Sequence, residues 1–399
     1  MLIIIYLAFI SLGLPDSLIG SAWPVMQGEL GVPLSFAGIV TMIIAGGTIV
    51  SSLLSDRLTR RFGAGLVTAV SVLMTAAALW GFSLSRSFFL LCLWGIPYGL
   101  GAGAVDAALN NYVALHYSSR HMSWLHCFWG VGASISPYIM GYCLTGPSGW
   151  SGGYRTVAVL QMALTAILFI SLPLWKRRQT GGAEGTQEAR ALGLGQTLKI
   201  KGVPLILIAF FCYCAVEQTA GLWASSYLVQ FRGIDPELAA RFASLFFLGI
   251  TGGRFLCGFV AEKLGDTRLI RIGIVTVIGG VVLMALPIAG DLPALAGLVV
   301  IGFGCAPIYP SIIHSTPANF GRENSQSIIG VQMASAYIGT TFMPPLFGLL
   351  AAHVHIGLFP LYLLLLTALM LLFEAPLLTL LNTPAESFEA TMEYVAICA

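Results

Sequence analysis

Residues 99 to 113 read G-L-G-A-G-A-V-D-A-A-L-N-N-Y-V, an apolar, glycine-rich stretch that holds one acid, Asp106, and an amide one helical turn later, Asn110. A carboxylate in the middle of a bilayer costs about 3 kcal/mol or more unless it faces a partner or a wet interior. A chain that keeps an acid at that depth uses its charge or its proton. The stretch therefore predicts a membrane transporter in which Asp106 binds the coupling cation.

The rest of the chain is apolar enough to support this prediction. Of its 399 residues, 57% are hydrophobic and 9% are charged, whereas about a quarter of the residues in soluble domains are charged. A helix needs about 20 mostly apolar residues to cross a bilayer. The sequence therefore predicts an all-α integral membrane protein with twelve transmembrane helices. The twelve segments are 2–27, 36–55, 64–84, 88–113, 122–145, 155–175, 203–229, 238–261, 268–290, 293–315, 325–351 and 356–381.

Basic residues are distributed unevenly over the loops between these segments. If both termini are cytoplasmic, the inner loops hold fourteen of the nineteen Lys and Arg residues and the outer loops hold four, with Arg254 left inside a segment. Such a bias towards the cytoplasmic side is typical of membrane proteins and fits an even number of crossings. We expect a protein of the bacterial inner (plasma) membrane with both termini in the cytoplasm.

The chain divides into two halves of six predicted helices. A polar, glycine-rich connection at 176–190 separates them, and part of the first half recurs 206 residues later, where Gly46-Gly47 and Asp56-Arg57 become Gly252-Gly253 and Glu262-Lys263. Parallel repeats of six helices form one large class of transporters, with the substrate site near the bilayer midplane between them. The predicted parts are a first bundle at 1–176, a linker at 177–201, a second bundle at 202–382 and a cytoplasmic tail at 383–399.

Two short motifs carry a resemblance to a known family. S-L-L-S-D-R-L-T-R-R at residues 52–61 resembles the loop signature of the major facilitator superfamily, and G-F-V-A-E-K-L-G at 258–265 resembles its copy in the second half. Ser52 and Thr59 stand where that signature usually has glycine. The resemblance extends over essentially the whole chain. It implies a secondary transporter that works by alternating access.

The acids of these motifs end the second helix of each half. The eleventh and fifth helices are expected to begin on the same side, and a helix start carries unpaired N–H groups and the positive end of the helix dipole. An acid placed there would latch the two halves together. The alternative is that these residues are solvated loop charges. The predicted latch consists of Asp56, Arg57, Arg60, Arg61, Glu262 and Lys263.

Further motifs resemble one branch of the superfamily. V-D-A-A-L-N-N-Y-V at 105–113 is similar to the acid-x-x-x-Asn pattern in the fourth helix of the fucose-galactose-glucose proton symporter family, whose fucose permease has Glu where this chain has Asp106. G-L-P-D-S-L-I-G-S-A-W-P at 13–24 places Asp16 where that family has an acid, and residues 123–133 and 306–310 resemble further segments of its relatives. The resemblance implies a sugar or polyol substrate and a coupled proton.

Several polar residues inside the predicted helices are candidates for the substrate site. Asp16 and Trp23 recur on one face of the first helix, and a carboxylate beside an aromatic ring suits a sugar. Helix packing is the alternative for Trp23, and contacts between helices are the alternative for the buried amides. Glu217 lies at the corresponding place in the seventh helix. The predicted substrate-binding set is Asp16, Trp23, Asn110, Gln161, Glu217, Gln218 and Gln332.

Arg254 and His126 complete the candidates. Arg254 is a permanent cation deep inside the eighth helix and needs a carboxylate, for which we expect Glu217. Alternatively, Arg254 binds an anionic substrate, and the chain then carries an organic anion, a monocarboxylate or a drug-like solute. His126 titrates near neutral pH in its unperturbed form and can serve cation coupling together with Asp106, or it only bonds a neighbouring helix.

The sequence also limits the classes of function and partner. The chain has no H-E-x-x-H or G-x-S-x-G motif and no phosphate-binding glycine loop, so we expect no enzyme activity, no cofactor and no metal site. The expected partners are a small solute, the lipid bilayer and H⁺ or Na⁺, with no nucleic acid, and the expected state is a monomer. H⁺ is preferred because one carboxylate suffices to bind it, whereas Na⁺ needs several oxygen ligands. A membrane sensor that transports nothing is a further alternative.

Overall fold

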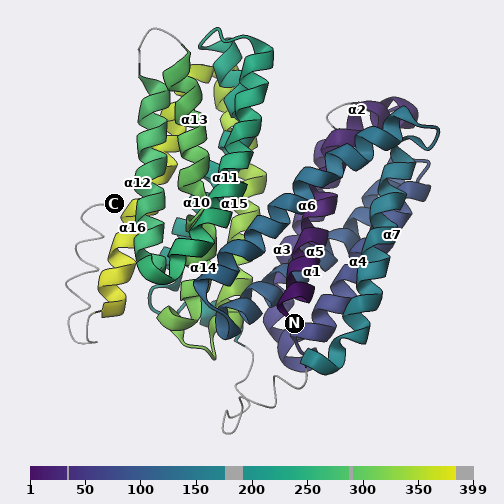
Figure 1. Cartoon of the computed structure of the whole chain (residues 1–399), viewed down its shortest axis with the longest axis horizontal. Coiled ribbons are helices and arrows are strands. Elements are labelled where there is room, and N and C mark those ends of the chain that lie inside the picture. The colour runs from purple at the N-terminus through teal and green to yellow at the C-terminus, as the bar shows by residue number, and fades with distance from the viewer. Residues whose placement is uncertain (34–35, 176–191, 287–290, 383–399) are drawn as a thin grey trace. The chain divides into compact units, whose positions relative to one another are not determined.

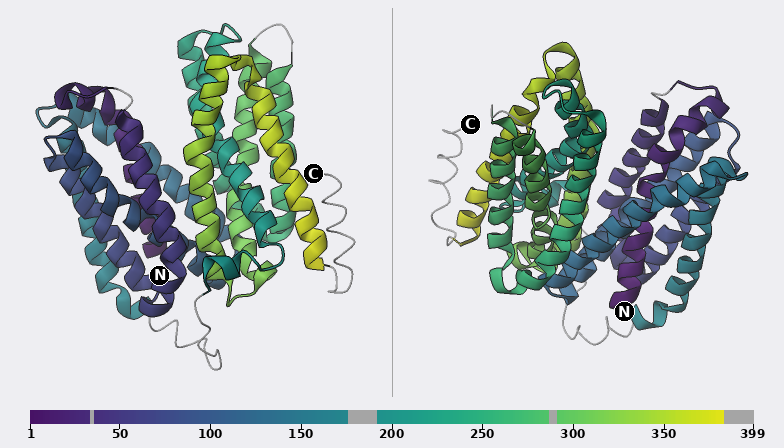
Figure 2. Two further views of the ribbon diagram at one scale, coloured as in Figure 1. Left: turned by 180° about the vertical axis from the view of Figure 1, so that it is seen from behind. Right: turned by 45° about the horizontal axis from the view of Figure 1, so that its top comes forward.

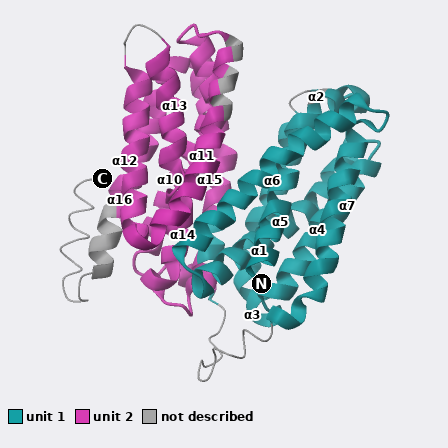
Figure 3. Ribbon diagram, in the orientation of Figure 1, with its two compact units in different colours: residues 1–192, 329–334 teal, residues 193–328, 335–399 magenta. Residues whose placement is uncertain are grey.

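The computed structural model describes residues 1–33, 36–175, 192–286 and 291–382, and within these ranges it contains helices and no β-strand (Figure 1). These residues form two compact units, coloured separately in Figure 3. The first comprises Met1–Leu192 with Ile329–Ala334, and the second comprises Gly193–Ile328 with the described residues from Ser335 onward. Residues 177–191 of the predicted linker and the predicted tail at 383–399 lie outside the described ranges.

Helices α1 to α7 make up the first unit, in which they run side by side as a bundle (Figure 2). The glycine-rich helix α5 packs against α3 and α4. It can do so because its small residues allow backbone contact: a Cβ on Gly99 would lie 2.1 Å from the backbone oxygen of Ile44. The bounds are α1 Leu2–Asp16, α2 Leu18–Leu30, α3 Phe36–Phe62, α4 Ala64–Leu84, α5 Phe88–His116, α6 Ser119–Thr145 and α7 Gly149–Ile170.

Helices α9 to α16 make up most of the second unit. Helix α10 lies against α11, α13, α14 and α16, so it has neighbours on several sides. The bounds are α9 Leu194–Thr197, α10 Val203–Gln230, α11 Pro236–Leu264, α12 Asp266–Ala285, α13 Leu292–Cys305, α14 Ile308–Phe320, α15 Ser325–His353, the 3₁₀ turn η1 Ile356–Leu358 and α16 Phe359–Asn382.

Two of the predicted membrane segments are interrupted helices. In the first unit a turn at Ser17 separates α1 from α2, and in the second unit a turn at Ala306–Pro307 separates α13 from α14. Proline explains both sites, because it has no N–H for the carbonyl four residues earlier and its ring crowds that carbonyl. Pro15 stands just before the first turn, and Pro307 lies within the second.

Most of these helices are long enough to cross a bilayer. Ten helices or interrupted pairs of the described chain are long and apolar enough to cross a bilayer. Two more, α6 with 27 residues and α15 with 29, have the length but carry more polar side chains. They begin at Ser119 and Ser325, which are 206 residues apart like the repeated motif. The prediction of an all-α membrane fold is confirmed, and the described chain contains twelve such segments when α6 and α15 are counted.

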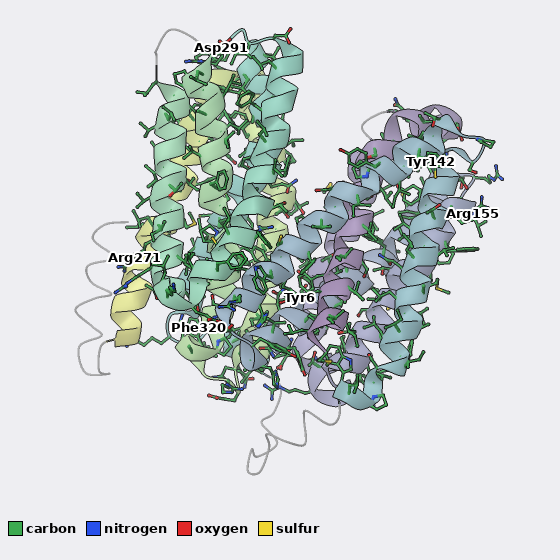
Figure 4. The ribbon with its side chains drawn as sticks, in the orientation of Figure 1. Tyr6, Tyr142, Arg155, Arg271, Asp291 and Phe320 are labelled. Carbon is green, nitrogen blue, oxygen red and sulfur yellow. The ribbon has the colours of Figure 1, made fainter. Side chains whose placement is uncertain are left out.

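Side chains fill the interior of each bundle (Figure 4). In the first unit Tyr142 and Arg155 lie near the end at which α6 meets α7, while in the second unit Arg271 lies on α12 beside α16 (Figure 4). Arg271 forms an ion pair at 3.6 Å with Glu374, a buried acid of α16. The exposed fraction of Glu374 is 2%.

Candidate functional site

Asp16 lies at the interruption of the first predicted membrane segment. Its Oδ1 accepts a hydrogen bond from the hydroxyl of Tyr98 on α5 at 3.2 Å, and its Oδ2 accepts one from Nε1 of Trp129 on α6 at 2.9 Å. Both donors fix the orientation of the carboxylate, which is itself exposed. Each carboxylate oxygen has a second lone pair. Asp16 is therefore a fixed acceptor with room for further hydrogen bonds.

The backbone of α1 explains why Trp129 reaches Asp16. A Cβ on Gly13 would lie 2.1 Å from the backbone oxygen of Trp129, so only glycine allows α1 and α6 to approach this closely. Pro15 leaves the carbonyl of Ser11, four residues earlier, without its helical donor. Nε2 of Gln161 on α7 donates to that carbonyl at 2.6 Å. Gln161 thus stabilises the helix end that carries Asp16.

Asp106, Asn110 and His126 form a second, buried polar chain between α5 and α6. Nδ2 of Asn110 donates to Oδ1 of Asp106 at 2.8 Å and to its backbone oxygen at 3.0 Å. The amide oxygen of Asn110 lies 3.0 Å from Nε2 of His126, so His126 must carry its proton on Nε2 to donate. Phe9 packs edge-on against the His126 ring at 5.4 Å. One amide therefore links the two titratable groups.

The structure separates the two acids of the first unit along α5. Tyr98, which binds Asp16, precedes Asp106 by eight residues, or about 12 Å of helix. Asn110 was predicted to bind substrate beside Asp16, but it is fully buried and bonded to Asp106 and His126. The first unit thus has an accessible acid at the interruption and an enclosed acid deeper in the bundle.

Glu217 and Arg254 form the polar centre of the second unit. Nη2 of Arg254 lies 3.1 Å from Oε2 of Glu217, so the structure places together the two groups that the sequence paired. Arg254 has an exposed side-chain fraction of 3% and Glu217 one of 20%. The hydroxyl of Tyr213 contacts the same Oε2 and accepts a hydrogen bond from Nη2 of Arg254 at 3.4 Å. It also lies 3.0 Å from the backbone oxygen of Cys305. The charges of this cluster sum to zero.

The other predicted substrate residues differ in their surroundings. Trp23 was predicted to share one helix face with Asp16, but the turn at Ser17 interrupts that helix. Trp23 is buried in the apolar core of the first unit. Oε1 of Gln161 accepts a hydrogen bond from Thr75 at 2.8 Å, so both ends of this amide bind neighbouring helices. Gln218 is exposed and Gln332 is buried on α15. Their roles in binding stay predictions.

The predicted latch residues belong to helices. Helix α3 continues to Phe62, beyond the predicted end at residue 55, because the segment has good helix formers and an i, i+4 pair. In that pair Nε of Arg60 lies 2.7 Å from Oδ1 of Asp56, whose Oδ2 accepts from the backbone N of Leu192 at 3.2 Å. The remaining latch residues, Arg57, Arg61, Glu262 and Lys263, are exposed. Latching between the halves stays a prediction.

Three aromatic residues of these clusters were not predicted to take part. Tyr213 precedes Glu217 by four residues, so helical spacing could have found it. Tyr98 and Trp129 could not be found in this way, because their contacts with Asp16 depend on how α1 packs against α5 and α6. No group of three or more His, Cys, Asp or Glu side chains in the described part of the chain could hold a metal ion.

Comparison with known proteins gives one family. The model of the Major Facilitator Superfamily matches residues 5–295 and 242–393. The uncharacterized transporter y4wD of Sinorhizobium fredii is 26% identical over 82% of this chain and 85% of its own length. In Bacillus subtilis, the hexuronate transporter is 22% identical over 66% of this chain and 65% of its own length, and the glucose/mannose transporter GlcP is 22% identical over 61% of both. This chain thus spans less than two thirds of those two.

Solved structures share the fold at low sequence identity. The transporter FucP in the outward conformation aligns with a TM-score of 0.73 and 16% identity, over 94% of this chain and 97% of its own. The proton:xylose symporter XylE bound to 6-bromo-6-deoxy-D-glucose aligns with a TM-score of 0.76 and 13% identity, over 96% and 95%. At these identities the likeness establishes the fold.

Proposed function

The chain belongs to the Major Facilitator Superfamily, and from that premise we propose that this secondary transporter carries a sugar-like, hydroxyl-rich solute together with a proton. The observation that carries this proposal is Asp16, an exposed carboxylate fixed by two donors. Its free lone pairs accept hydroxyl hydrogens, and the half-buried indole of Trp129 beside it offers an aromatic edge. A carboxylate next to an indole is a suitable surface for a pyranose.

Glu217 of the second unit is a further carboxylate that can accept a hydroxyl hydrogen. Oε2 of Glu217 is held by Tyr213 and Arg254, whereas Oε1 has no hydrogen-bond donor among the described residues. Glu217 is partly exposed. A hydroxyl group can therefore donate to Oε1 without disturbing the ion pair.

The enclosed chain of Asp106, Asn110 and His126 supports proton coupling. The partners of Asp106 described above are an amide and, through it, an imidazole. Neither of these two partners is a permanent charge, so the contacts through Asn110 do not themselves require Asp106 to be ionised. An imidazole nitrogen at this place suits a proton better than Na⁺, which prefers oxygen ligands.

The names of similar proteins agree with this proposal. The relatives include a glucose/mannose transporter, and the structural neighbours include a proton:xylose symporter. The relatives also include a hexuronate transporter, and a hexuronate carries a carboxylate on a sugar. This relative favours, as a second candidate, an organic anion that binds Arg254.

The charge distribution of the loops supports an orientation. Fourteen basic residues lie in the loops assigned to the inside, and both termini are therefore proposed to be cytoplasmic, in a bacterial inner membrane. We propose a monomer that alternates between two accessible states. The latch acids Asp56 and Glu262 would stabilise one of these states.

A ligand screen on the purified protein tests the proposal. Sugars, polyols and carboxylates are added one at a time, with and without Na⁺, and the melting temperature is recorded. A ligand at 100 times its Kd stabilises the protein by about 2.7 kcal/mol. We expect a hydroxyl-rich ligand to stabilise the wild type, and Asp16→Asn to reduce the shift. The sugar assignment would be contradicted if carboxylates without hydroxyl groups raise the melting temperature while sugars and sugar acids do not.

A further inference from the structure

Gly20 is an interior residue of α2 whose lack of a side chain is explained neither by packing nor by backbone conformation. It is exposed, and a Cβ on it would meet no atom within 4 Å. Its φ is not positive, so the backbone there is open to any residue. Glycine inside a helix is less stable than alanine. A glycine kept in open space therefore indicates that a side chain would obstruct something.

The space over Gly20 lies beside Asp16. Ser17, which links α1 to α2, keeps right-handed angles of φ −102° and ψ −1°, and the backbone N of Ser21 donates to its backbone oxygen at 3.2 Å. The chain therefore keeps winding in the same sense from Asp16 to Gly20, four residues later. A helical side chain leans towards the N-terminus and covers the preceding turn. Any side chain at position 20 would thus cover part of the approach to Asp16.

The carbonyl of Gly20 lacks its regular helical donor. In an α-helix it would accept from the N–H of residue 24, which is a proline and has no N–H. The neighbouring serine hydroxyls bond elsewhere: Ser17 donates to the backbone oxygen of Ala133 at 2.6 Å, and Ser21 donates to that of Ser17 at 2.9 Å. This oxygen therefore offers a hydrogen-bond acceptor on an exposed residue, one helical turn from Asp16.

The exposed surface around Gly20 differs from a lipid-facing one. It includes the acid Asp16, and among the described side chains of α2 Val25 is the one large hydrophobic residue that is exposed. In α16, by contrast, Leu361 and Leu365 are 62% and 58% exposed. An acid within a membrane segment faces the bundle interior or a water-filled cavity. A hydroxyl-rich solute can therefore reach this surface from water.

We propose that Gly20 is a specificity-determining residue, over whose bare backbone the solute ring lies while one hydroxyl donates to Asp16 and another to the Gly20 carbonyl. This inference rests on the proposed function and narrows the solute to a sugar of pyranose size. Positions 16 and 20 are about 6 Å apart along the helix axis, a separation that hydroxyl groups on opposite edges of a hexopyranose can bridge. Both acceptors take hydroxyl hydrogens, so the solute needs no charge.

The size limit follows from the missing side chain. One additional methylene in a binding pocket changes selectivity by about 10- to 200-fold. A methyl group at position 20 would lie between the helix and the ring. A short, flexible polyol can place two hydroxyls on the acceptors without lying flat on the backbone, so it should tolerate that methyl group.

Gly20→Ala tests the size limit on the full-length purified protein. Equilibrium binding of labelled D-glucose and of labelled erythritol, a short linear polyol, is measured together with the melting temperature. We expect glucose to bind at least about tenfold more weakly than in wild type, and erythritol to stay within about twofold. The melting temperature should stay the same or rise, because alanine is the better helix former and its Cβ meets open space.

Pro24→Ala tests the carbonyl. It restores an N–H that can bond the Gly20 oxygen within the helix, so this oxygen is no longer available to a solute. We expect glucose and erythritol both to bind about tenfold more weakly, as for one lost hydrogen bond, with an unchanged or higher melting temperature. Unchanged binding at an unchanged melting temperature would overturn the inference. If this variant instead melts at a lower temperature, Gly20→Ala alone decides.

Gly28→Ala is the matched control, since Gly28 is a second exposed glycine of α2 at which a Cβ would meet no atom within 4 Å. It should bind both probes as wild type does. Glucose binding that falls in Asp16→Asn but not in Gly20→Ala would overturn this inference and leave the proposed function standing. An equal loss in Gly20→Ala and Gly28→Ala would also overturn it, because the effect would then belong to the helix and not to the site. If wild type binds neither glucose nor erythritol, the proposed function and this inference are both wrong.

Discussion

The two units hold their buried acids in different ways. In the first unit Asp106 is bonded to the amide of Asn110, which leads to His126, while in the second unit Glu217 is bonded to a permanent cation. The contact of Asp106 with Asn110 joins an acid to an amide, which carries no charge. The contact of Glu217 with Arg254 joins an acid to a permanent cation, so removing one member leaves the other without its opposite charge. The contrast predicts that single substitutions in the second pair are the more damaging.

Arg254→Gln should have the largest effect. It leaves Glu217 without a cation inside the second unit, and breaking a buried pair costs about 3–5 kcal/mol. Because Glu217 keeps a fifth of its exposure, we expect the lower end, about 3 kcal/mol, together with loss of transport. The measurements are melting temperature and uptake. The double change with Glu217→Gln should recover most of the lost stability, and a coupling energy of zero would contradict a stabilising ion pair.

Asp106→Asn should abolish proton-driven accumulation and spare solute exchange. The amide imitates the neutral acid, so proton-driven accumulation is lost while exchange of labelled solute across proteoliposomes continues. The new amide keeps an acceptor for Nδ2 of Asn110, so we expect a smaller stability change than for Arg254→Gln, about 1 kcal/mol. Accumulation at the wild-type level would remove Asp106 from coupling, and a stability loss as large as that of Arg254→Gln would break the contrast between the units.

Gln161→Leu tests the neutral network around the first interruption. It removes the donor to the Ser11 carbonyl and the acceptor for Thr75, which leaves buried polar groups unsatisfied. A cost of about 2 kcal/mol is expected. Gln161→Glu keeps the acceptor for Thr75 and serves as the partial control. If Gln161 binds solute directly, affinity will fall while the melting temperature is unchanged.

Trp129→Phe should weaken solute binding with little effect on folding. It removes the indole donor to Oδ2 of Asp16 but keeps an aromatic ring. One hydrogen bond to a charged group is worth about 1.5–3 kcal/mol, and the exposure of Asp16 places the effect at the lower end, about tenfold in Kd. Trp124→Phe, a change of another α6 tryptophan, is the control. Equal affinities in both variants would exclude Trp129 from the site.

Asp56→Asn should have the smallest effect. If Asp56 caps a helix of the other half, its charge is worth about 0.3–2 kcal/mol, which moves a balanced conformational equilibrium several-fold. The rate of cysteine labelling from the cytoplasmic side should rise accordingly. Arg86→Gln, at an exposed residue outside the predicted latch, is the control. An unchanged labelling rate would leave Asp56 with only its contacts to Arg60 and Leu192.

Hydrophobic length alone predicted where the helices lie, because a segment that crosses a bilayer must be long and apolar. Spacing along one helix also predicted that Asn110 lies one turn from Asp106, although Asn110 was assigned to the substrate and not to this acid. The pairing of Glu217 with Arg254 followed from charge, since a buried cation needs an acid. Hydrophobic length and helical spacing act within one segment, and the attraction between a buried cation and an acid is strong enough to decide how two helices pack.

Contacts that depend on the approach of two helices were not predictable. Because the helix is interrupted at Ser17, Trp23 lies in the apolar core and not on the face of Asp16. Pro15 was a signal in the sequence for this interruption. The donors Tyr98 and Trp129 reach Asp16 because of how closely α1 packs against its neighbours, and no single-helix pattern encodes that distance. The extension of α3 to Phe62 was missed because charged residues were taken to end the helix.

The polar character of α6 and α15 has a consequence for biosynthesis. A nascent helix enters the lipid from the translocon according to its own hydrophobicity, and these two helices occupy equivalent places, 206 residues apart. Helix α6 packs against α1, which is synthesised earlier. We expect α6 to be retained beside the translocon until α1 covers its polar side chains, so the first half would assemble around its fifth membrane segment as that segment emerges from the ribosome.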